Sequence, residues 1–337
     1  MQKKQLTKLK TFLSKPRNLL IVTHWSPDGD AMGSSLGLYN FLKKLQHKVT
    51  VITPNDYPPF LNWLPGNKNV RIFSQEPALC KKITAKAELI FCLDFNSLKR
   101  IDKLGDEVAA SKAPKVIVDH HLQPDGFAHY LYHDVKSSST AELIYSLICE
   151  MGLKKLMNAD IANCLYTGIM TDTGSFRFPS ATSKTHRTAA DLIDAGANNS
   201  EAYNRIFDTN SADRVKLLGF CLGEKLKIFP EYRTGLISLS GDEMQQFNYR
   251  KGDTEGFVNY ALSVSGIRFA VFFAERDEII KCSFRSKGSF DVNAFARKHF
   301  EGGGHANASG GMSKRTLDQT IAYFISLLPS YSKKLNK

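Results

Sequence analysis

The stretch Leu19-Leu20-Ile21-Val22-Thr23 runs directly into His24-Trp25-Ser26-Pro27-Asp28-Gly29-Asp30. A short apolar run that stops at polar residues is typical of a buried strand. Here it ends in an imidazole and two carboxylates, and open α/β sheets bind their ligands at the carboxyl ends of the strands. After this loop, residues 31–45 carry apolar side chains at helical spacing, and residues 48–53 alternate like a strand. The sequence therefore predicts a β-turn-α-β unit with a polar site at its first turn.

Other apolar segments also stop at an acidic residue or a histidine. A single Asp after a strand is more often a helix N-cap or a turn residue, and a pair of histidines is often structural. Four segments with the same ending favour one shared site at one edge of a sheet. The three further segments are residues 88–93 before Asp94, residues 115–118 before Asp119-His120-His121, and residues 166–171 before Asp172.

The residue types at these endings favour a hard divalent metal ion. His24, Asp28 and Asp30 offer one nitrogen and several oxygens, a set that suits Mn²⁺ or Mg²⁺ better than zinc. Three ligands do not fill two coordination shells, so a two-metal centre needs the later segments as well. Two such ions lower the pKa of a bound water and stabilise both oxygens of an in-line phosphoryl displacement. The sequence thus predicts a shared metal site that is suited to a two-metal centre of this kind.

The spacing of these residues resembles a known family. The series His24-x-x-x-Asp28-x-Asp30, Asp94, Asp119-His120-His121 and Asp172 resembles the successive motifs of the DHH phosphoesterases. Phe284-Arg285-Ser286, followed by Gly302-Gly303-Gly304-His305-x-x-Ala308-Ser309-Gly310, resembles the DHH-associated domain of the same family. Within the family, the chain is most similar to the stand-alone oligoribonuclease and 3′-phosphoadenosine-5′-phosphate (pAp) phosphatase type.

The resemblance implies a role for each of the metal-ligating residues. Two divalent ions are expected, with Mn²⁺ as the first choice and Mg²⁺ as the alternative. His121 is expected to donate a proton to the leaving group, and Asp119 to orient an imidazole. The implied ligands are His24 and Asp28 for one ion, Asp30, His120 and Asp172 for the other, and Asp94 as the bridge between them.

The resemblance also implies substrate-binding residues in the second half of the chain. Arg285, Gly303, Gly304 and His305 are expected to hold a terminal phosphate or base, opposite the metals across an interdomain cleft. A guanidinium binds phosphate oxygens bidentately, and glycines allow backbone N–H groups to approach an anion. On the glycine run alone, the end of a helix is the favoured explanation, and it is Arg285 and the resemblance that favour phosphate binding.

The predicted fold class is α/β with two domains. We expect a mainly parallel-sheet catalytic domain over residues 1–190, a helical linker over 191–224 and a smaller α/β substrate-binding domain over 225–331. In the last part, residues 234–239, 267–274 and 279–284 are predicted strands, and residues 292–300 a helix. The basic tail, residues 332–337, is expected to fray.

Ser139-Thr140-Ala141-Glu142 resembles a capping box and predicts the start of a helix. Whether these hydroxyl groups only cap the helix or also face a phosphate is open at this point. The six cysteines, which lack C-x-x-C spacing, are expected to be reduced core residues.

Composition fits a polyanionic substrate. The net charge of +12 and pI near 9.3 leave a cationic surface around an acidic site. The expected substrates are short RNA or DNA oligonucleotides and nucleotides such as pAp, which would yield AMP and phosphate. The alternative is a phosphodiesterase of cyclic or linear dinucleotides. Less favoured are a RecJ-like exonuclease, an inorganic pyrophosphatase and a non-catalytic nucleotide-binding module.

The expected location is the cytoplasm, with no membrane partner. The apolar stretch before His24 is too short for a signal sequence or a membrane helix. A homodimer is the assembly considered for this chain.

Overall fold

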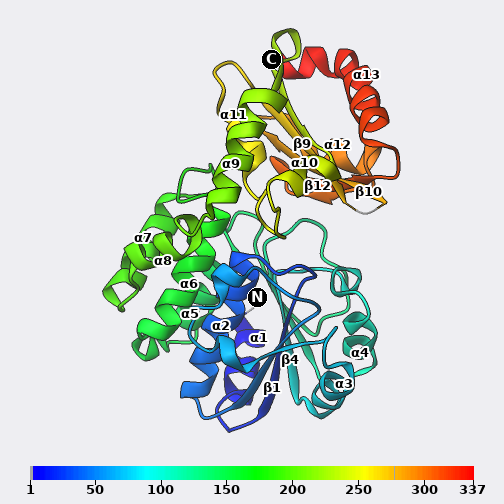
Figure 1. Ribbon diagram of the computed structural model, residues 1–337. Helices are drawn as coiled ribbons and strands as arrows, with labels where there is room; N and C mark the ends of the chain where they lie inside the picture. The colour runs from blue at the N-terminus through cyan, green and yellow to red at the C-terminus, as the bar shows by residue number, and fades with distance from the viewer. Residues whose placement is uncertain (1–2, 277) are drawn as a thin grey trace. The chain divides into compact units, whose positions relative to one another are not determined.

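The computed structural model describes residues 3–276 and 278–337 and divides into two compact units. Unit 1 spans Met1–Thr209 and unit 2 spans Asn210–Lys337. Each unit is built on a sheet with helices on both faces, as Figure 1 shows. The α/β fold class is therefore confirmed for both.

Unit 1 contains six strands and eight helices among its described residues. They are α1 (Lys3–Phe12), β1 (Asn18–Thr23), α2 (Gly29–Lys44), β2 (Lys48–Thr53), β3 (Val70–Ile72), α3 (Pro77–Lys86), β4 (Leu89–Leu93), α4 (Leu104–Ala110), β5 (Lys115–Asp119), β6 (Tyr130–His133), α5 (Thr140–Glu150), α6 (Ala159–Asp172), α7 (Ser183–Asp194) and α8 (Asn199–Phe207).

The sheet of unit 1 is parallel throughout, in the order β3-β2-β1-β4-β5-β6. Both of its faces are buried, which explains why its strands are continuous apolar runs. Leu19 and Ile21 of β1 enter a core shared with α2, α5 and α6, while Leu20 and Val22 enter a second core with α3 and α4. In Figure 1 the two groups of helices cover opposite faces of this sheet.

Helices α2 and α6 approach each other closely because α2 carries glycine at every fourth position. A Cβ atom on Gly33 would lie 2.6 Å from the carbonyl oxygen of Cys164 and 2.7 Å from the nitrogen of Gly168, both in α6. A Cβ on Gly29 would lie 2.3 Å from Oγ1 of Thr171. The glycines therefore let the carboxyl end of α6 reach the amino end of α2.

The prediction that residues 166–171 end at the sheet edge is wrong. These residues form the last turns of α6, which Asn158 caps by accepting from the N–H of Ile161 at 3.2 Å. Seven consecutive residues, 164–170, are buried. A helix that is buried on nearly all sides has no polar face, so its sequence resembles a buried strand.

Unit 2 contains a second six-stranded sheet, of mixed direction, in the order β11-β12-β10-β9-β8-β7. Strands β8 and β9 are parallel and the other neighbours antiparallel. The elements are α9 (Ala212–Phe220), β7 (Lys227–Phe229), β8 (Thr234–Leu239), α10 (Gly241–Gln246), α11 (Phe257–Ser263), β9 (Phe269–Arg276), β10 (Ile279–Ser286), α12 (Val292–His299), β11 (Gly303–Gly304), β12 (Ala308–Ser313) and α13 (Leu317–Leu335).

The core of unit 2 is rich in phenylalanine. Phe269, Phe273 and Phe284 of the sheet contact Phe295 of α12 and Phe324 of α13 on one face. The other face packs against α9, α10 and α11. The tail does not fray as expected, because α13 continues to Leu335, whose side chain is fully buried.

The division between the units falls within the segment expected to link the domains. Helix α8 belongs to unit 1 and α9 to unit 2. All six cysteines are free thiols, and five of them are buried. Among the described residues, the helices lack the combination of length and apolar character that crossing a membrane requires.

Candidate metal centre

Three adjacent parallel strands deliver the centre of the site. β1 pairs with β4, and β4 pairs with β5, so the residues that follow them emerge side by side. These residues are His24 after β1, Asp94 after β4, and His120 after β5. Asp94 comes from the middle strand, and all three side chains are buried, with 8%, 2% and 6% of each residue exposed.

Asp94 has a strained backbone. Its φ is +64°, a region that residues other than glycine seldom occupy, while its N–H donates to the carbonyl of Val118 at 3.1 Å. Such conformations cost free energy and persist where the surrounding structure enforces them. Here the turn directs the carboxylate toward both neighbouring histidines, with Oδ2 3.3 Å from Nε2 of His24 and Oδ1 3.6 Å from Nε2 of His120.

The six residues expected as metal ligands lie together in unit 1. His24, Asp28 and Asp94 form one group whose ligand atoms all lie within 4.8 Å of one another, and Asp30, His120 and Asp172 form another. The two groups meet at Asp94 and His120. Asp172 arrives from the last residue of α6 rather than from a strand, and its Oδ2 lies 3.5 Å from Nε2 of His120.

Both imidazoles are oriented by backbone carbonyl groups. Nδ1 of His24 lies 2.9 Å from the carbonyl oxygen of Trp25, and Nδ1 of His120 lies 3.2 Å from that of Ser137. A carbonyl accepts only, so Nδ1 carries the proton and Nε2 faces the carboxylates. Histidines that bind metal ions have this arrangement.

Asp28 and Asp30 each lie in the acidic cluster and also accept hydrogen bonds from the first N–H groups of a helix. Asp28 is the N-cap of α2 and accepts from the N–H groups of Asp30 and Ala31, both at 3.0 Å. Asp30 accepts from the first N–H groups of α5, Thr140 at 2.7 Å and Ala141 at 2.8 Å. Helix N-termini stabilise negative charge, so these contacts fix both carboxylates in place. Asp28 is thus both the N-cap of α2 and one of the expected metal ligands.

Crowding of like charges shifts the pKa values in the cluster. Burial raises the pKa of Asp30 well above its usual value, and the charges of Asp94, Asp172 and Asp28 raise it further. Burial acts the same way on Asp94, but the hydrogen bond from His24 and the charges of the three histidines lower its pKa well below the usual value.

The two inward-facing histidines hold their protons more tightly than free imidazole. Burial alone would lower both pKa values. For His24, the hydrogen bond to Asp94 and the charge of Asp28 outweigh burial and raise the pKa, and for His120 the charges of Asp172 and Asp94 do the same. Divalent cations neutralise such a cluster and displace these protons.

Asp119 and His121 form a separate pair beside the cluster. Asp119 is fully buried, and its Oδ1 lies 2.7 Å from Nδ1 of His121, while its Oδ2 accepts from the His121 N–H at 3.1 Å. His121 Nδ1 also lies 3.7 Å from Oδ1 of Asp94. The imidazole that Asp119 orients is therefore His121, and the pairing leaves Nε2 at the opposite end of the ring.

The segment Ser137–Glu142 has a part in the site that the sequence did not reveal. Ser139 caps α5 by accepting from the Glu142 N–H at 3.0 Å, as expected, but Glu142 does not complete the capping box. Its Oε2 instead accepts from the N–H of Ser138 at 2.9 Å. One hydroxyl, that of Thr140, faces the acidic cluster and donates to Oδ1 of Asp94 at 3.0 Å.

The residues expected to bind substrate lie in unit 2, at one end of its sheet. Arg285 of β10 pairs with Ala308 of β12, and Gly304 of β11 pairs with Ser309 of the same strand. His305 begins the turn back to β12, where its N–H donates to the carbonyl of Ala308 at 2.8 Å. Arg285 and the pair Gly303–Gly304 thus lie on the two strands that flank β12, and His305 lies in the turn that follows β11.

The glycine run has a structural reason within the sheet. A Cβ on Gly302 would lie 2.0 Å from the carbonyl oxygen of Gly310, and one on Gly304 would lie 2.7 Å from that of Ala308. Gly304 also has a φ of +143°. The glycines allow two strands to approach closely, rather than only ending α12.

Comparisons with known proteins agree with this architecture. Residues 18–169 match the DHH family, N-terminal domain, and residues 236–330 match the DHHA1 domain. The bifunctional oligoribonuclease and PAP phosphatase NrnA of Bacillus subtilis is 33% identical, over 90% of this chain and 92% of its own length. The cyclic-di-AMP phosphodiesterase PdeA of Listeria monocytogenes is 26% identical, over 96% of this chain but 49% of its own length.

A solved structure is similar over the full chain. The crystal structure of an exopolyphosphatase-related protein from Bacteroides fragilis matches with a TM-score of 0.96 and 40% identity, and covers 100% of this chain and 98% of its own. The similarity to it and to NrnA extends across both units. The chain therefore belongs to the DHH family, in the group that joins a DHH domain to a DHHA1 domain.

Proposed function

We propose that this protein is a metal-dependent phosphoesterase that hydrolyses short oligonucleotides to mononucleotides and pAp to AMP and phosphate. The observation that carries the proposal is the pair of His/Asp groups that meet at Asp94. Relatives with the same two domains along nearly their whole length are named oligoribonuclease and PAP phosphatase. The substrate class comes from these names, and the chemistry from the residues.

The donor set fits two divalent ions. Asp94 presents one carboxylate oxygen toward each group, as a bridging ligand does. His24 and Asp28 complete one set, and Asp30, His120 and Asp172 the other. Mixed imidazole and carboxylate ligands favour Mn²⁺, with Mg²⁺ as the alternative. When bound, two such ions supply a reactive water near neutral pH and stabilise charge on the phosphoryl group.

His121 is the proposed general acid. Its proton on Nδ1 is held by Asp119 at 2.7 Å, so Nε2 is the nitrogen that exchanges a proton with the leaving oxygen. Asp119 fixes the tautomer and the direction of the ring, and stabilises the imidazolium form. In unit 2, Arg285 and the Gly303–Gly304–His305 strand end are proposed to bind a phosphate or base of the substrate.

A panel of substrates tests the proposal. Purified protein with Mn²⁺ is incubated with pAp, an RNA dinucleotide, a longer RNA, cyclic di-AMP and pyrophosphate. We expect turnover of pAp and the dinucleotide, with slower cleavage of the long RNA. Asp94→Ala is the control, because loss of the shared carboxylate removes every activity together. Hydrolysis of pyrophosphate alone would overturn the proposal.

Cyclic-dinucleotide hydrolysis is the second candidate. PdeA of Listeria monocytogenes, a cyclic-di-AMP phosphodiesterase, matches almost the whole of this chain with about half of its own length. The shared half includes both domains. Cleavage of cyclic di-AMP faster than of the linear dinucleotide, in the same panel, would favour this candidate.

A further inference from the structure

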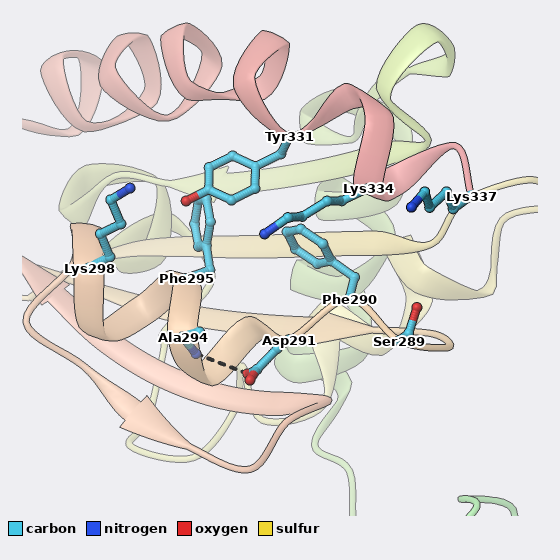
Figure 2. A pocket seen from close by; sticks show the side chains of 9 residues that line it. All are labelled: Ser289, Phe290, Asp291, Ala294, Phe295, Lys298, Tyr331, Lys334 and Lys337. Carbon is cyan, nitrogen blue, oxygen red and sulfur yellow. Dashed lines mark hydrogen bonds between the residues drawn. The ribbon is translucent and has the colours of Figure 1, made fainter.

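A cavity in unit 2 lies apart from every residue proposed above for catalysis or substrate binding. It has a volume of about 430 Å³ and lies between α12, the residues that precede it, and the end of α13 (Figure 2). Pockets of about 300 Å³ and more accommodate small organic ligands.

The floor of this cavity is aromatic and ordered. The Tyr331 ring contacts Phe290 and Phe295 edge-on, at centroid distances of 5.8 and 5.1 Å. Its hydroxyl lies 2.8 Å from Nε2 of His299, which fixes the ring between α12 and α13. Both phenylalanines are almost fully buried. The Tyr331 ring is therefore held in place and forms one side of the cavity.

The rim of the cavity is cationic. Lys298 extends from α12, and Lys334 and Lys337 from the end of the chain, as Figure 2 shows. Within residues 3–276 and 278–337, none of these three ammonium groups has a carboxylate within 4.0 Å. The one side-chain carboxylate of the lining, Asp291, accepts from the Ala294 N–H at 2.9 Å as the cap of α12.

From this arrangement we propose a binding site for a phosphate-bearing ligand of about mononucleotide size. Three ammonium groups border one opening, and each of them attracts an anion that binds there. The apolar wall of Tyr331 suits the body of a nucleotide, and the lysines suit its phosphate. The site does not depend on the metal centre of unit 1.

Lysine footprinting on the full chain tests this site. The rate at which an amine-reactive reagent acetylates each lysine is measured by mass spectrometry, with AMP, inorganic phosphate or adenosine present at constant ionic strength. We expect AMP to slow the modification of Lys298 and Lys334, phosphate to do so less, and adenosine not at all. Lys333, exposed in the same turn of α13 but outside the lining, is the internal control.

Two variants sharpen the result. Lys298→Gln should weaken AMP protection of Lys334 by roughly threefold, the effect of one exposed charge pair, while Lys333→Gln should leave it unchanged. Equal protection of Lys333 and Lys334, protection by adenosine, or no protection by AMP would each overturn the proposal.

A second and independent observation concerns Glu142 of unit 1. This residue is 1% exposed, and its Oε2 accepts from the Ser138 hydroxyl at 2.6 Å, the Ser138 N–H at 2.9 Å and the Thr185 hydroxyl at 3.3 Å. Among the residues that the structure describes, none donates a hydrogen bond to its Oε1, and Nζ of Lys184 lies 4.0 Å away. A buried carboxylate that accepts several hydrogen bonds from one loop holds that loop in a fixed conformation.

The loop that Glu142 holds contacts three of the six expected ligands. The Ser137 carbonyl orients His120, the Thr140 and Ala141 N–H groups hold Asp30, and the Thr140 hydroxyl holds Asp94. We infer that Glu142 is a positioning residue for the metal group Asp30, His120 and Asp172. It acts through Asp30 and His120, the two members of that group that the loop contacts. This inference rests on the proposed function, since it presumes that the set binds a metal ion.

Mn²⁺ titration followed by electron paramagnetic resonance tests it without any substrate. Loss of groups that orient a ligand lowers metal affinity by about 10- to 100-fold, so Glu142→Gln should weaken one of two Mn²⁺ sites by this factor and leave the other nearly unchanged. Glu150→Gln, on the same helix but bonded to Tyr132, is the matched control.

The outcomes separate the two ideas. If the wild-type protein binds no Mn²⁺, the proposed function fails. If it binds two ions and Glu142→Gln binds both with wild-type affinity, only the positioning role fails. Equal weakening of both sites, or the same weakening in Glu150→Gln, would show a general structural effect and also overturn that role.

Discussion

The candidate residues of the two units differ in how they are held. In unit 1, His24, Asp30, Asp94 and His120 are each less than 9% exposed and contact one another or the end of a helix. In unit 2, Arg285, Gly303 and His305 are partly exposed and lie on strands that end at the surface. A buried cluster of charges is costly unless cations or protons compensate it, whereas exposed residues suit reversible binding. This difference supports the proposal that unit 1 carries the chemistry and unit 2 the recognition of substrate.

The largest expected effect comes from Asp94, the residue proposed to bridge the two metal groups. Asp94→Ala should reduce turnover of pAp and the RNA dinucleotide below detection, because each group loses a ligand. Without metal, its melting temperature should fall modestly, because His24 and His120 lose the carboxylate that stabilises their charged form, while Asp30 is relieved of one like charge. Turnover, bound manganese and thermal unfolding are the measurements. Retention of both manganese ions would contradict the role of Asp94 as a bridge.

Next in size is the effect of the proposed general acid. His121→Ala should lower kcat by roughly 10²- to 10⁴-fold with the metal content unchanged. Asp119→Asn should also lower kcat, by a smaller factor, because it weakens the hydrogen bond to Nδ1 of His121 but keeps the imidazole. Rates within a few-fold of wild type in His121→Ala would exclude it as the acid.

The corresponding substitution in unit 2, at Arg285, should change substrate binding rather than the rate of the chemical step. Arg285→Gln is expected to raise KM by about tenfold or more, the value of a lost charge-assisted hydrogen bond, with kcat less affected. Lys287→Gln, near the same strand end but outside the expected site, is the control. A fall in kcat at unchanged KM would show that Arg285 acts in the transition state, against the division between the units.

A smaller effect concerns pH. The pKa values of Asp30, His24 and His120 are raised in the folded protein, so the metal-free protein binds more protons than its unfolded chain and loses stability as pH rises. The lowered pKa of Asp94 acts only in acid, below the usual value for Asp. Bound metal replaces the protons. The rise in melting temperature on adding Mn²⁺ should therefore be larger near about pH 8 than near about pH 6.

An Asp30→Asn variant provides the check on this pH effect. Its metal-free melting temperature should vary less with pH than that of wild type. A manganese-induced shift that is the same at both pH values would show that protons and metal do not compete in this cluster.

The sequence was most informative where a strand ends. His24, Asp94 and His120 follow apolar runs, and parallel pairing then forces them together at one edge. Asp172 could not be placed in this way because α6 is buried on most sides and lacks a polar face. The sequence does contain one indication of this packing. Gly29, Gly33 and Gly37 recur at every fourth position of α2, a spacing that predicts a helix face against which another helix packs closely.

Interactions between distant segments were beyond the sequence. Glu142 has the spacing of a capping box, yet its carboxylate accepts from the nearby Ser138 and from Thr185, a donor that only the tertiary fold brings to it. In unit 2, the two-residue strand β11 has no alternation to detect, and it exists only through pairing with β12. Local patterns predict elements, while such contacts depend on what packs beside them.

The smallest expected effect comes from the same substitution, glycine to alanine, made once in each unit. Gly33→Ala places a methyl group 2.6 Å from backbone atoms of α6, which cannot move aside, so it should lower the free energy of unfolding by about 1–3 kcal/mol. Gly219→Ala, in helix α9 of unit 2, meets nothing within 4 Å and should raise it by about 0.5–1 kcal/mol, because alanine favours the helix. Denaturant unfolding and Mn²⁺ affinity of both variants are the measurements. Since α6 carries Asp172, only Gly33→Ala should also weaken metal binding; an equal loss in Gly219→Ala would show that the close approach of α2 and α6 does not set the position of that carboxylate.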